Sequence, residues 1–563
     1  MSDAWLVGRA RELRAAVQST RRSDQLRIVD ELDALLEETQ SRGEPGLIAD
    51  LLRSAAAGRL STPGHGPASE PLIDELLAHT RKHGLVLLRA DAHALHGRRL
   101  VLTGKEDAAL TELARALAIL DDLPEPESPT ERRTFERTLA ATLVDCWLVL
   151  NELGIYEVAE EISTRTHGAL RDSAGPHDIT LQMLNLITML LAWALRLERV
   201  RRFAEAQDKF ALAASIAAAV EAPFSESLFR RQHAPAIEQV GVLAAAVALT
   251  KPGAEHVERL RALFTHHGNA AAHERPFVAI ALARCLERES RREEGLNVLL
   301  AARDDAGKDN VLASMRLNLD RELSRLECAS RPDVPTSVLA YTGALEAELW
   351  ALRESRAAAL QTRRKHERLS AEHGAIAAQA LQDPLTGLPN RRALDDQLRA
   401  LSSSVAAQPL SVALVDLDGF KGVNDNKSHA EGDDVLRVIA STLRDALRGN
   451  DFVARYGGDE FVVLLPGAPA SSATAAMNRA VHAVAALPGH LSHGVTLSVG
   501  LVSMASQEHP EAVLTRADEA MYQAKRGGGN RVASATLGAG TAHPDHFGGA
   551  GAGDPPWDEV GDT

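Results

Sequence analysis

The chain has 563 residues, which is enough for several domains with sizeable hydrophobic cores. Hydrophobic residues make up 45% of the sequence and charged residues 25%, as in an ordinary soluble globular protein. The formal net charge of −15 argues against a general nucleic-acid-binding protein, because such proteins carry a basic face. We therefore expect no nucleic-acid partner.

Ala and Leu dominate the sequence and aromatic residues make up only 4%, which favours helices over a β-sandwich. Cys146, Cys285 and Cys328 show no CxxC pair or metal-ligand spacing, which indicates buried thiols in a reducing compartment.

The N-terminus lacks the apolar core of a signal peptide. The longest apolar run, Leu186–Leu195, is about half of the ~20 residues that a membrane span needs. We expect a cytoplasmic protein with no membrane partner.

Residues 1–335 form the first predicted region, in which apolar residues recur at three- and four-residue spacing, as in successive helices. Three stretches, beginning at Trp147, Trp193 and Ala283, each pair an apolar helix with an amphipathic one. This region resembles a degenerate tetratricopeptide (TPR-like) solenoid with a unit of ~45 residues instead of 34. A solenoid could bind a protein partner on its concave face; a plain helical bundle that serves as a dimerising scaffold is the alternative.

Residues 338–381 form the second predicted region, a long linker helix without proline. Leu345, Leu352 and Ala359 recur every seven residues, and Leu349 is offset by four, which is typical of a coiled-coil seam. A single solvated helix is the alternative. A coiled coil here would pair two copies of the chain.

Residues 382–535 form the third predicted region, where strands alternate with helices in an α/β pattern. The expected helices and strands, besides two short strands around Gly457-Gly458, are Leu410–Asp418, Gly432–Leu447, Ser471–Leu487, Val495–Val502 and Pro510–Lys525. The Gly/Pro-rich acidic tail, from about Ala533 and assigned as residues 536–563, is predicted to be disordered.

The stretch RYGGDEFVVLLPG, Arg455 to Gly467, predicts a hairpin, because a tight turn needs the positive φ that Gly457 and Gly458 supply cheaply. Asp459 and Glu460 then begin the return strand, while the strand Leu410–Asp418 ends in Asp416 and Asp418. If these strand ends meet in one sheet, Asp416 and Glu460 lie a few ångströms apart.

Two bare carboxylates at that distance would repel, and one of them would take up a proton. A divalent cation removes this conflict, and Mg²⁺ prefers hard carboxylate oxygens. Two ions ~3.5–4 Å apart can activate an attacking oxygen and stabilise a phosphate that is being displaced. The alternative is a set of surface carboxylates that cap turns.

Residues Asp383 to Val532 resemble the GGDEF family of diguanylate cyclases. Five motifs in the family's order carry this resemblance: DPLTGLPNRR, VDLDGFKGVND, HAEGDDVL, RYGGDEF and ADEAMYQAKRGGGNRV. The resemblance implies a palm-like α/β cyclase domain that condenses two GTP into cyclic di-GMP and releases two pyrophosphates. It also implies a homodimer, in which each copy holds one GTP with two Mg²⁺ ions per active site, or Mn²⁺ in their place.

The resemblance assigns a role to each matching position. Its metal ligands are Asp416, the Leu417 carbonyl, Asp459 and Glu460, and its catalytic residues are Glu460, which takes the 3′-hydroxyl proton, and Lys421. Its substrate-binding residues are Phe420, Lys421, Asn424, Asp433, Gly457, Gly458, Lys525 and Arg526. Among these, Asn424 and Asp433 read guanine, because an amide donates and accepts while a carboxylate accepts two N–H bonds.

Two positions depart from the family pattern. Ser428 stands where the family usually has glycine, and Gly529 stands where it often has a phosphate-contacting arginine, for which the nearby Arg526 could compensate. We expect a weaker grip on the triphosphate and no loss of function. In the first motif, Asp383 is expected to pair with Arg391 or Arg392 as a structural clamp.

Arg448 and Asp451 in the stretch RGND match the spacing of the family's inhibitory RxxD site for cyclic di-GMP. An ordinary charge pair at a helix end is the alternative.

For the domain as a whole, the alternative function is an inactive receptor that binds cyclic di-GMP or GTP. The enzyme is favoured by the presence of Asp416, Lys421, Asn424, Asp433 and Glu460.

Overall fold

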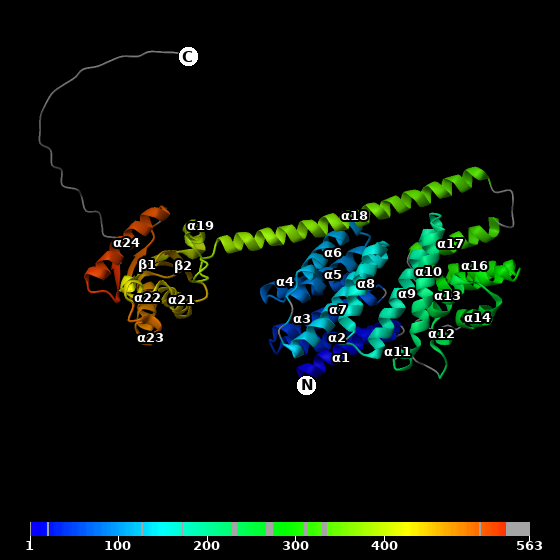
Figure 1. The fold of residues 1–563 in the computed structure, drawn as a ribbon, viewed down its shortest axis with the longest axis horizontal. Coiled ribbons are helices and arrows are strands. Elements are labelled where there is room, and N and C mark those ends of the chain that lie inside the picture. The colour runs from blue at the N-terminus through cyan, green and yellow to red at the C-terminus, as the bar shows by residue number, and fades with distance from the viewer. Residues whose placement is uncertain are drawn as a thin grey trace, which may run out of the picture. The chain divides into compact units, whose positions relative to one another are not determined.

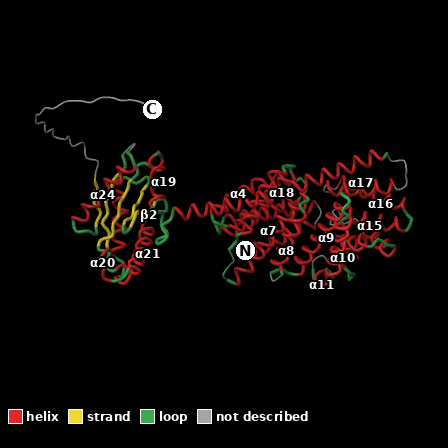
Figure 2. Tube along the Cα trace, turned by 45° about the horizontal axis from the view of Figure 1, so that its top comes forward, coloured by secondary structure: helices red, strands yellow, loops and turns green. Residues whose placement is uncertain are grey.

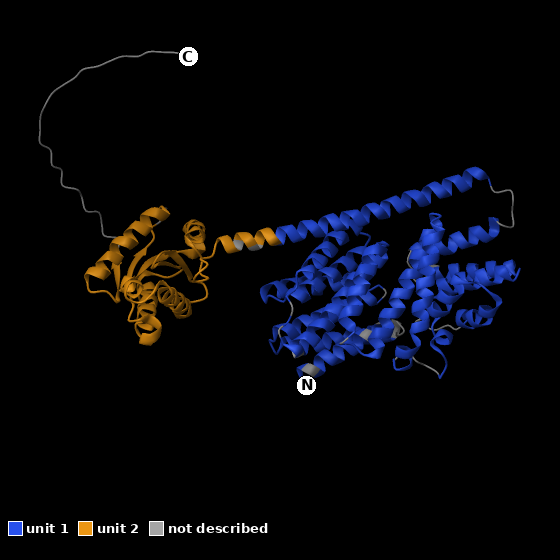
Figure 3. Cartoon of the chain, viewed as in Figure 1, with its two compact units in different colours: residues 1–371 blue, residues 372–563 orange. Residues whose placement is uncertain are grey.

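The computed structural model describes residues 2–19, 22–62, 64–124, 126, 128–171, 173–227, 233–265, 274–308, 313–328, 335–505 and 508–535. The tail that is predicted to be disordered, residues 536–563, lies outside the described residues. The chain divides into two compact units, residues 1–371 and 372–563, which Figure 3 colours separately.

Unit 1 is built from helices. Its first nine are α1 (Asp3–Ser19), α2 (Arg22–Gln40), α3 (Pro45–Ser61), α4 (Glu70–Lys82), α5 (Val86–Leu102), α6 (Glu106–Asp121), α7 (Pro129–Leu153), α8 (Tyr156–Leu170) and α9 (Pro176–Arg199). The others are α10 (Phe203–Ala219), α11 (Glu221–Ser225), α12 (Ala236–Gln239), α13 (Gly241–Thr250), α14 (Val257–Thr265), α15 (Arg275–Arg288), α16 (Arg292–Lys308), α17 (Ala313–Cys328) and α18 (Thr336–Ala380). The boundary between the units falls inside α18. This mostly helical region agrees with the predicted fold class (Figure 1).

Consecutive helices of unit 1 pack as hairpins, among them α5–α6, α7–α8, α9–α10 and α15–α16. The last three are the helix pairs expected from the stretches at Trp147, Trp193 and Ala283. A left-handed residue closes each of the four turns, and the next backbone N–H donates to a carbonyl five residues earlier. The left-handed residues are Gly104, Gly154, Arg201 and Ser290. The type of repeat that these hairpins form stays a prediction.

Helix α9 is the one helix of the described residues that is long and apolar enough to cross a membrane. It spans 24 residues, and half of its most apolar window is buried inside unit 1. Ile187, Leu190, Leu191 and Leu195 of α9 are buried in the hydrophobic core of unit 1. The predicted run Leu186–Leu195 therefore lies in a longer helix that packs against protein.

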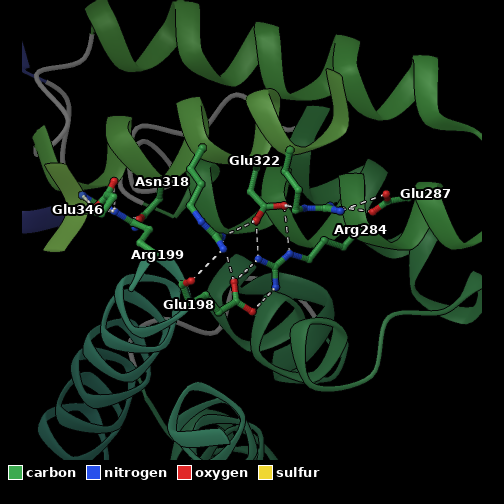
Figure 4. A network of polar contacts seen from close by, with 9 residues as sticks. Glu198, Arg199, Arg284, Glu287, Asn318, Glu322 and Glu346 are labelled. Atoms are coloured by element: carbon green, nitrogen blue, oxygen red, sulfur yellow. Dashed lines mark hydrogen bonds and ion pairs between the residues drawn. The ribbon is translucent and has the colours of Figure 1, made fainter. Parts of the chain in front are cut away.

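A network of charged side chains joins α9, α15 and α17 (Figure 4). Arg284 on α15 contacts Glu198 and Glu322, each at 2.6 Å, and the Glu322 side chain is only 1% exposed. Next to Glu198, Arg199 forms an ion pair with Glu346 of α18 at 2.8 Å. The start of α18 is thereby tied to the rest of unit 1.

Unit 2 is an α/β domain around one mixed sheet, drawn in yellow in Figure 2. Its strands are β1 (Ser411–Asp418), β2 (Phe452–Gly457), β3 (Glu460–Leu465), β4 (Thr496–Ser503) and β5 (Arg531–Ala535). They lie in the order β2-β3-β1-β4-β5, and only the β4–β5 pair is parallel. Its helices are the end of α18, α19 (Arg391–Ser402), α20 (Phe420–Asn426), α21 (His429–Ala446), α22 (Ala470–Ala485), α23 (Gly489–Ser492) and α24 (Pro510–Arg526).

The sheet has helices on both faces. Helices α21 and α22 share one hydrophobic cluster with it, and α19 and α24 share the other. The predicted helices and strands of this region exist with ends shifted by a few residues. The expected disorder from about Ala533 is wrong for residues 533–535, because these pair with β4 as part of β5.

Candidate functional site

The predicted meeting of Asp416 and Glu460 is confirmed, because these residues are register partners at the ends of β1 and β3. Side chains alternate along a strand, so neighbours two residues apart share a face. Leu414 and Val462 pack in the cluster that contains α24. The side chains of Asp416 and Glu460 therefore lie on the α24 face of the sheet.

Burial and the negative charges of neighbouring carboxylates raise the pKa of both Asp416 and Glu460 above the ordinary values. For Glu460 the largest cause is burial, followed by the negative charges of Asp416 and Asp459, with Asp518 of α24 adding to them. For Asp416 burial is again the largest cause, and Lys525 partly offsets it. This corner of the domain therefore holds more negative charge than its own surroundings neutralise.

Lys525, in the last turn of α24, lies in this carboxylate cluster. Its Nζ is 2.7 Å from Oδ2 of Asp416. In this structure the Lys525 ammonium thus pairs with the predicted metal ligand Asp416, and its expected phosphate contact stays a prediction. Within the described residues, no group of three or more His, Cys, Asp or Glu side chains is arranged to hold a metal ion. The oxygen donors suit Mg²⁺ in kind, and Lys525 supplies the positive charge beside them.

A pocket of about 450 Å³ lies beside the carboxylate cluster. Six predicted site residues line it: Phe420, Lys421, Asn424, Asp433, Gly458 and Asp459. Gly457 and Arg526 are exposed and lie outside this lining, as does Lys525. Asp459 belongs to the pocket and also acts on the carboxylates, so it joins the two parts of the site.

Three lining residues were not predicted: His429, Leu436 and Arg455. All three stand inside the motifs HAEGDDVL and RYGGDEF, so the motifs contained the signal. Gly432 was missed too, although it shapes the pocket. A Cβ at Gly432 would lie 2.1 Å from Oδ1 of Asn424, so only glycine lets α21 approach the predicted guanine reader this closely.

The expected clamp of Asp383 with Arg391 or Arg392 is wrong. Asp383 instead pairs with Arg455 at 3.0 Å, and Arg391 stacks its guanidinium over the Tyr456 ring. Arg455 also donates to the Gly458 carbonyl at 2.8 Å. Burial acts against the charged form of Asp383, but hydrogen bonds from Thr386 and Arg455 hold its pKa below the ordinary value. This ion pair fixes the glycine turn at the pocket.

The two departures from the family pattern have structural roles. Ser428 is the N-cap of α21, and its hydroxyl accepts a hydrogen bond from the Glu431 backbone N–H at 3.2 Å. Gly529 has φ +71°, and a Cβ there would press on the Asp418 carboxylate at 2.9 Å. Asp418 itself accepts hydrogen bonds from Thr496, Ser498 and the Asn530 backbone, so it acts as a structural residue.

Arg448 and Asp451 lie in the turn between α21 and β2, apart from the pocket lining. The Asp451 carboxylate accepts a hydrogen bond from the Arg448 backbone N–H at 2.9 Å. The Arg448 residue is exposed. Asp451 therefore shapes the loop that presents the arginine.

Residues 380–531 match the family model described as diguanylate cyclase, GGDEF domain. Unit 2 contains a GGDEF domain. In this GGDEF domain, the glycine-glycine turn and the two acids after it are residues 457–460.

Curated relatives match over the same domain. The chain is 44% identical over 161 residues to the diguanylate cyclase DgcP of Pseudomonas aeruginosa, covering 27% of this chain and 24% of the relative. It is 41% identical over 161 residues to the response regulator PleD of Caulobacter vibrioides, covering 27% of this chain and 36% of the relative. The chain thus spans about a quarter to a third of the length of these relatives.

Solved structures match as well. The coiled coil and GGDEF domain of DgcB from Caulobacter crescentus, in complex with c-di-GMP, is 32% identical, with a TM-score of 0.30, and covers 32% of this chain and 98% of that chain. The diguanylate cyclase SiaD from Pseudomonas aeruginosa, in complex with its activator SiaC, is 32% identical, with a TM-score of 0.32. That match covers 44% of this chain and 100% of that chain.

Proposed function

We propose that this protein is a diguanylate cyclase, which condenses two GTP into cyclic di-GMP with release of two pyrophosphates. The observation that carries the proposal is the pairing of Asp416 with Glu460 at adjacent strand ends, beside a pocket lined by Asn424 and Asp433. The match of residues 380–531 to the GGDEF family supports it.

In the proposed complex the pocket holds one GTP. Asn424 and Asp433 bind the guanine edge, since their amide and carboxylate can satisfy its acceptor and its N–H donors together. The backbone at Phe420 and the Lys421 ammonium bind the phosphates at the start of α20, where helix N–H groups favour negative charge. Gly457, Gly458 and Arg526 complete the phosphate contacts.

Glu460 is the proposed general base for the 3′-hydroxyl. Its raised pKa brings it closer to the pH at which a carboxylate accepts a proton efficiently. Asp416, the Leu417 carbonyl, Asp459 and Glu460 would hold two Mg²⁺, or Mn²⁺. When bound, these ions supply positive charge at the reacting phosphate. Lys525, which pairs with Asp416 in this structure, would contact the phosphates in the complex with GTP.

One such domain binds one GTP, so the reaction needs two copies whose pockets face each other. Positioning the two substrates then supplies a large part of the rate. We assign the pairing to α18 as a coiled-coil linker (residues 338–381), and we assign signal input to the TPR-like helices of residues 1–335, which could bind a protein partner. Since α9 is packed into unit 1 as a core helix, we propose a cytoplasmic location.

Arg448 and Asp451 are the proposed inhibitory site for cyclic di-GMP. The arginine guanidinium suits this ligand because its planar fork binds phosphate in a bidentate way and stacks on bases. The hydrogen bond that Asp451 accepts from the Arg448 backbone N–H presents the exposed arginine for such a contact.

The experiment that tests the proposed substrate compares GTP with ATP. Purified protein is incubated with each nucleotide and Mg²⁺, and the products are resolved by chromatography and mass. We expect cyclic di-GMP from GTP and no cyclic dinucleotide from ATP, and we expect Asp433→Asn to raise the KM for GTP. A protein that binds GTP and cyclic di-GMP but forms no product as a dimer would contradict the cyclase.

A further inference from the structure

Helix α18 packs one face against the rest of unit 1. The residues on this docked face alternate in spacings of four and three: Glu346, Trp350, Arg353, Ala357, Leu360, Arg364 and Glu367. Trp350 is 9% exposed, Arg353 1% and Leu360 0%. Arg353 donates to the Gly154 carbonyl at 2.6 Å, and Arg364 pairs with Asp121 at 2.7 Å. The docked face of α18 is therefore part of the core of unit 1. Figure 1 shows α18 running beside α6 and α8.

The predicted coiled-coil seam is a second face of α18, one residue earlier at each position. Leu345, Leu349 and Leu352 of this seam are 44%, 41% and 50% exposed. One residue along a helix turns the side chain by about 100°, so the seam lies beside the docked face and not under it. Helix α18 can thus be docked on its own unit and paired with another helix at the same time.

After Leu352, apolar residues no longer occupy every position of the seam. Seven residues after Leu349 stands Arg356, and seven further stands Arg363. In a parallel two-stranded coiled coil, equivalent seam positions face each other across the pair. Four arginines from two chains would therefore meet at positions where apolar residues are expected, and like charges in contact oppose pairing.

The start of α6 supplies the charges that these arginines lack. Arg356 forms an ion pair with Glu106, and Arg363 contacts the side chain of Asp107 at 2.5 Å. Arg363 also donates to the Asp107 carbonyl at 2.6 Å and to the Thr111 hydroxyl at 2.9 Å. Both arginine side chains remain about 30% exposed while they contact α6, so they lie at the edge of the seam.

We propose that Glu106 and Asp107 neutralise the seam arginines of α18 and thereby allow α18 to pair, in parallel, with a second copy of this chain. The helical region then controls dimer formation through these two carboxylates. While Glu106 and Asp107 contact Arg356 and Arg363, the coiled coil extends beyond Leu352. When these ion pairs break, the coiled coil ends at Leu352. This inference rests on the proposed function, because a cyclase site that uses two GTP is incomplete without the second copy.

The charge pattern identifies the occupant of the seam. In a parallel pair, the apolar segment Leu345–Leu352 of one chain contacts the same segment of the other chain. The segment that carries the neutralised Arg356 and Arg363 likewise contacts its copy in the other chain. An antiparallel copy would place the leucines of one chain against the arginines of the other. A parallel pair also brings the two C-terminal ends of α18, and so the two attached GGDEF domains, to the same end of the pair.

The test measures self-association of the full chain by sedimentation equilibrium without nucleotide. The variant Glu106→Gln/Asp107→Asn removes both neutralising charges, and we expect the dimer dissociation constant to rise about 10-fold or more. The matched control, Asp122→Asn/Glu161→Gln, removes two carboxylates that face Arg368 and Arg364 away from the seam. It should leave the dissociation constant within about 3-fold of the wild type.

Adding Arg356→Leu/Arg363→Leu to the first variant should restore dimerisation, because the seam no longer needs neutralisation. The inference is overturned if control and test variants lose dimerisation equally, or if the leucine substitutions fail to restore it in a protein with wild-type helix content. Association that follows the expected order, in a protein that makes no cyclic di-GMP, would overturn the proposed function alone.

Discussion

At the scale of single residues, the carboxylate cluster carries the proposed chemistry and also affects stability. Asp416 and Glu460 face each other with raised pKa values, and Lys525 neutralises only part of the charge. A raised pKa means that the folded protein binds the proton more tightly than the unfolded chain does. Stability contributed by the protonated group is therefore present at low pH and is lost as pH rises through the folded pKa.

Glu460→Gln is accordingly expected to stabilise the metal-free GGDEF domain. At about pH 8 its melting temperature should exceed that of the wild type by roughly 1–3 °C, and the difference should vanish near about pH 4. Thermal unfolding followed by circular dichroism at several pH values measures this. A stabilisation that is equally large at low pH would show that the charge of Glu460 is not its cause.

Gly432→Ala is expected to weaken substrate binding without lowering the stability of the GGDEF domain. Alanine favours a helix over glycine by up to ~1 kcal/mol, so α21 should not lose stability. The new methyl group would displace the Asn424 amide, which lies 2.1 Å from its position, and GTP affinity should fall ~10–100-fold. Calorimetric titration with GTP measures the loss. Gly489→Ala, whose Cβ would meet open space, is the control and should bind GTP as the wild type does.

The sequence predicted which acids meet but not every partner of the charged residues. Asp416 and Glu460 could be predicted because strand alternation and motif order fix them. The partner of Asp383 could not, because Arg455 reaches it from a strand 72 residues away, whereas Arg391 is drawn to the Tyr456 ring. Such pairings depend on tertiary approach, which no local pattern encodes.

At the scale of helices and strands, the cap of α21 explains one departure from the family pattern. Ser428 has extended backbone angles and caps the helix that carries Asp433. Ser428→Ala should destabilise the GGDEF domain by about 0.5–2 kcal/mol, whereas Ser428→Gly should cost only a few tenths of a kcal/mol. Urea unfolding of both variants measures the difference. Equal losses would mean that the hydroxyl does not cap the helix.

The helices and strands of unit 2 were predictable because their hydrophobic periods are long and clear. Strand β5 was missed, since the small residues from Ala533 look like the start of the Gly/Pro-rich tail; the parallel pairing with β4 forms the strand. In unit 1, the hairpins were predictable from helical periodicity. The turns at Arg201 and Ser290 were not, because these residues adopt a left-handed conformation that usually favours glycine.

At the scale of the whole molecule, the proposed inhibitory site at Arg448 would connect product to activity. Arg448→Ala should raise the concentration of cyclic di-GMP that halves the reaction rate by ~10-fold or more, since a charge-assisted phosphate contact is lost. The initial rate without product should stay unchanged, because Arg448 lies outside the pocket lining. Rates at increasing product concentration measure this. Arg444→Ala, an exposed arginine on α21, is the control and should keep full inhibition.

The division of the chain into a helical unit and a GGDEF unit follows from its composition, since the repeated helical period changes near Asp383 to alternating strands and helices. The docking of α18 on unit 1 could not be predicted in the same way. Its docked face and its exposed seam are both spaced by three and four residues, so the sequence alone does not say which one faces protein. The ion pairs that decide it join Glu346, Arg353 and Arg364 of the docked face to α9, α8 and α6.

The measurement that tests the central claim most directly is product formation by wild-type protein and Glu460→Gln in parallel. Each is incubated as a dimer with GTP and Mg²⁺, and cyclic di-GMP is quantified by chromatography. We predict cyclic di-GMP from the wild type and at least ~100-fold less from Glu460→Gln, because the variant lacks the proposed base. Equal product from both proteins, or none from a dimeric wild type that binds GTP, would contradict the proposed cyclase.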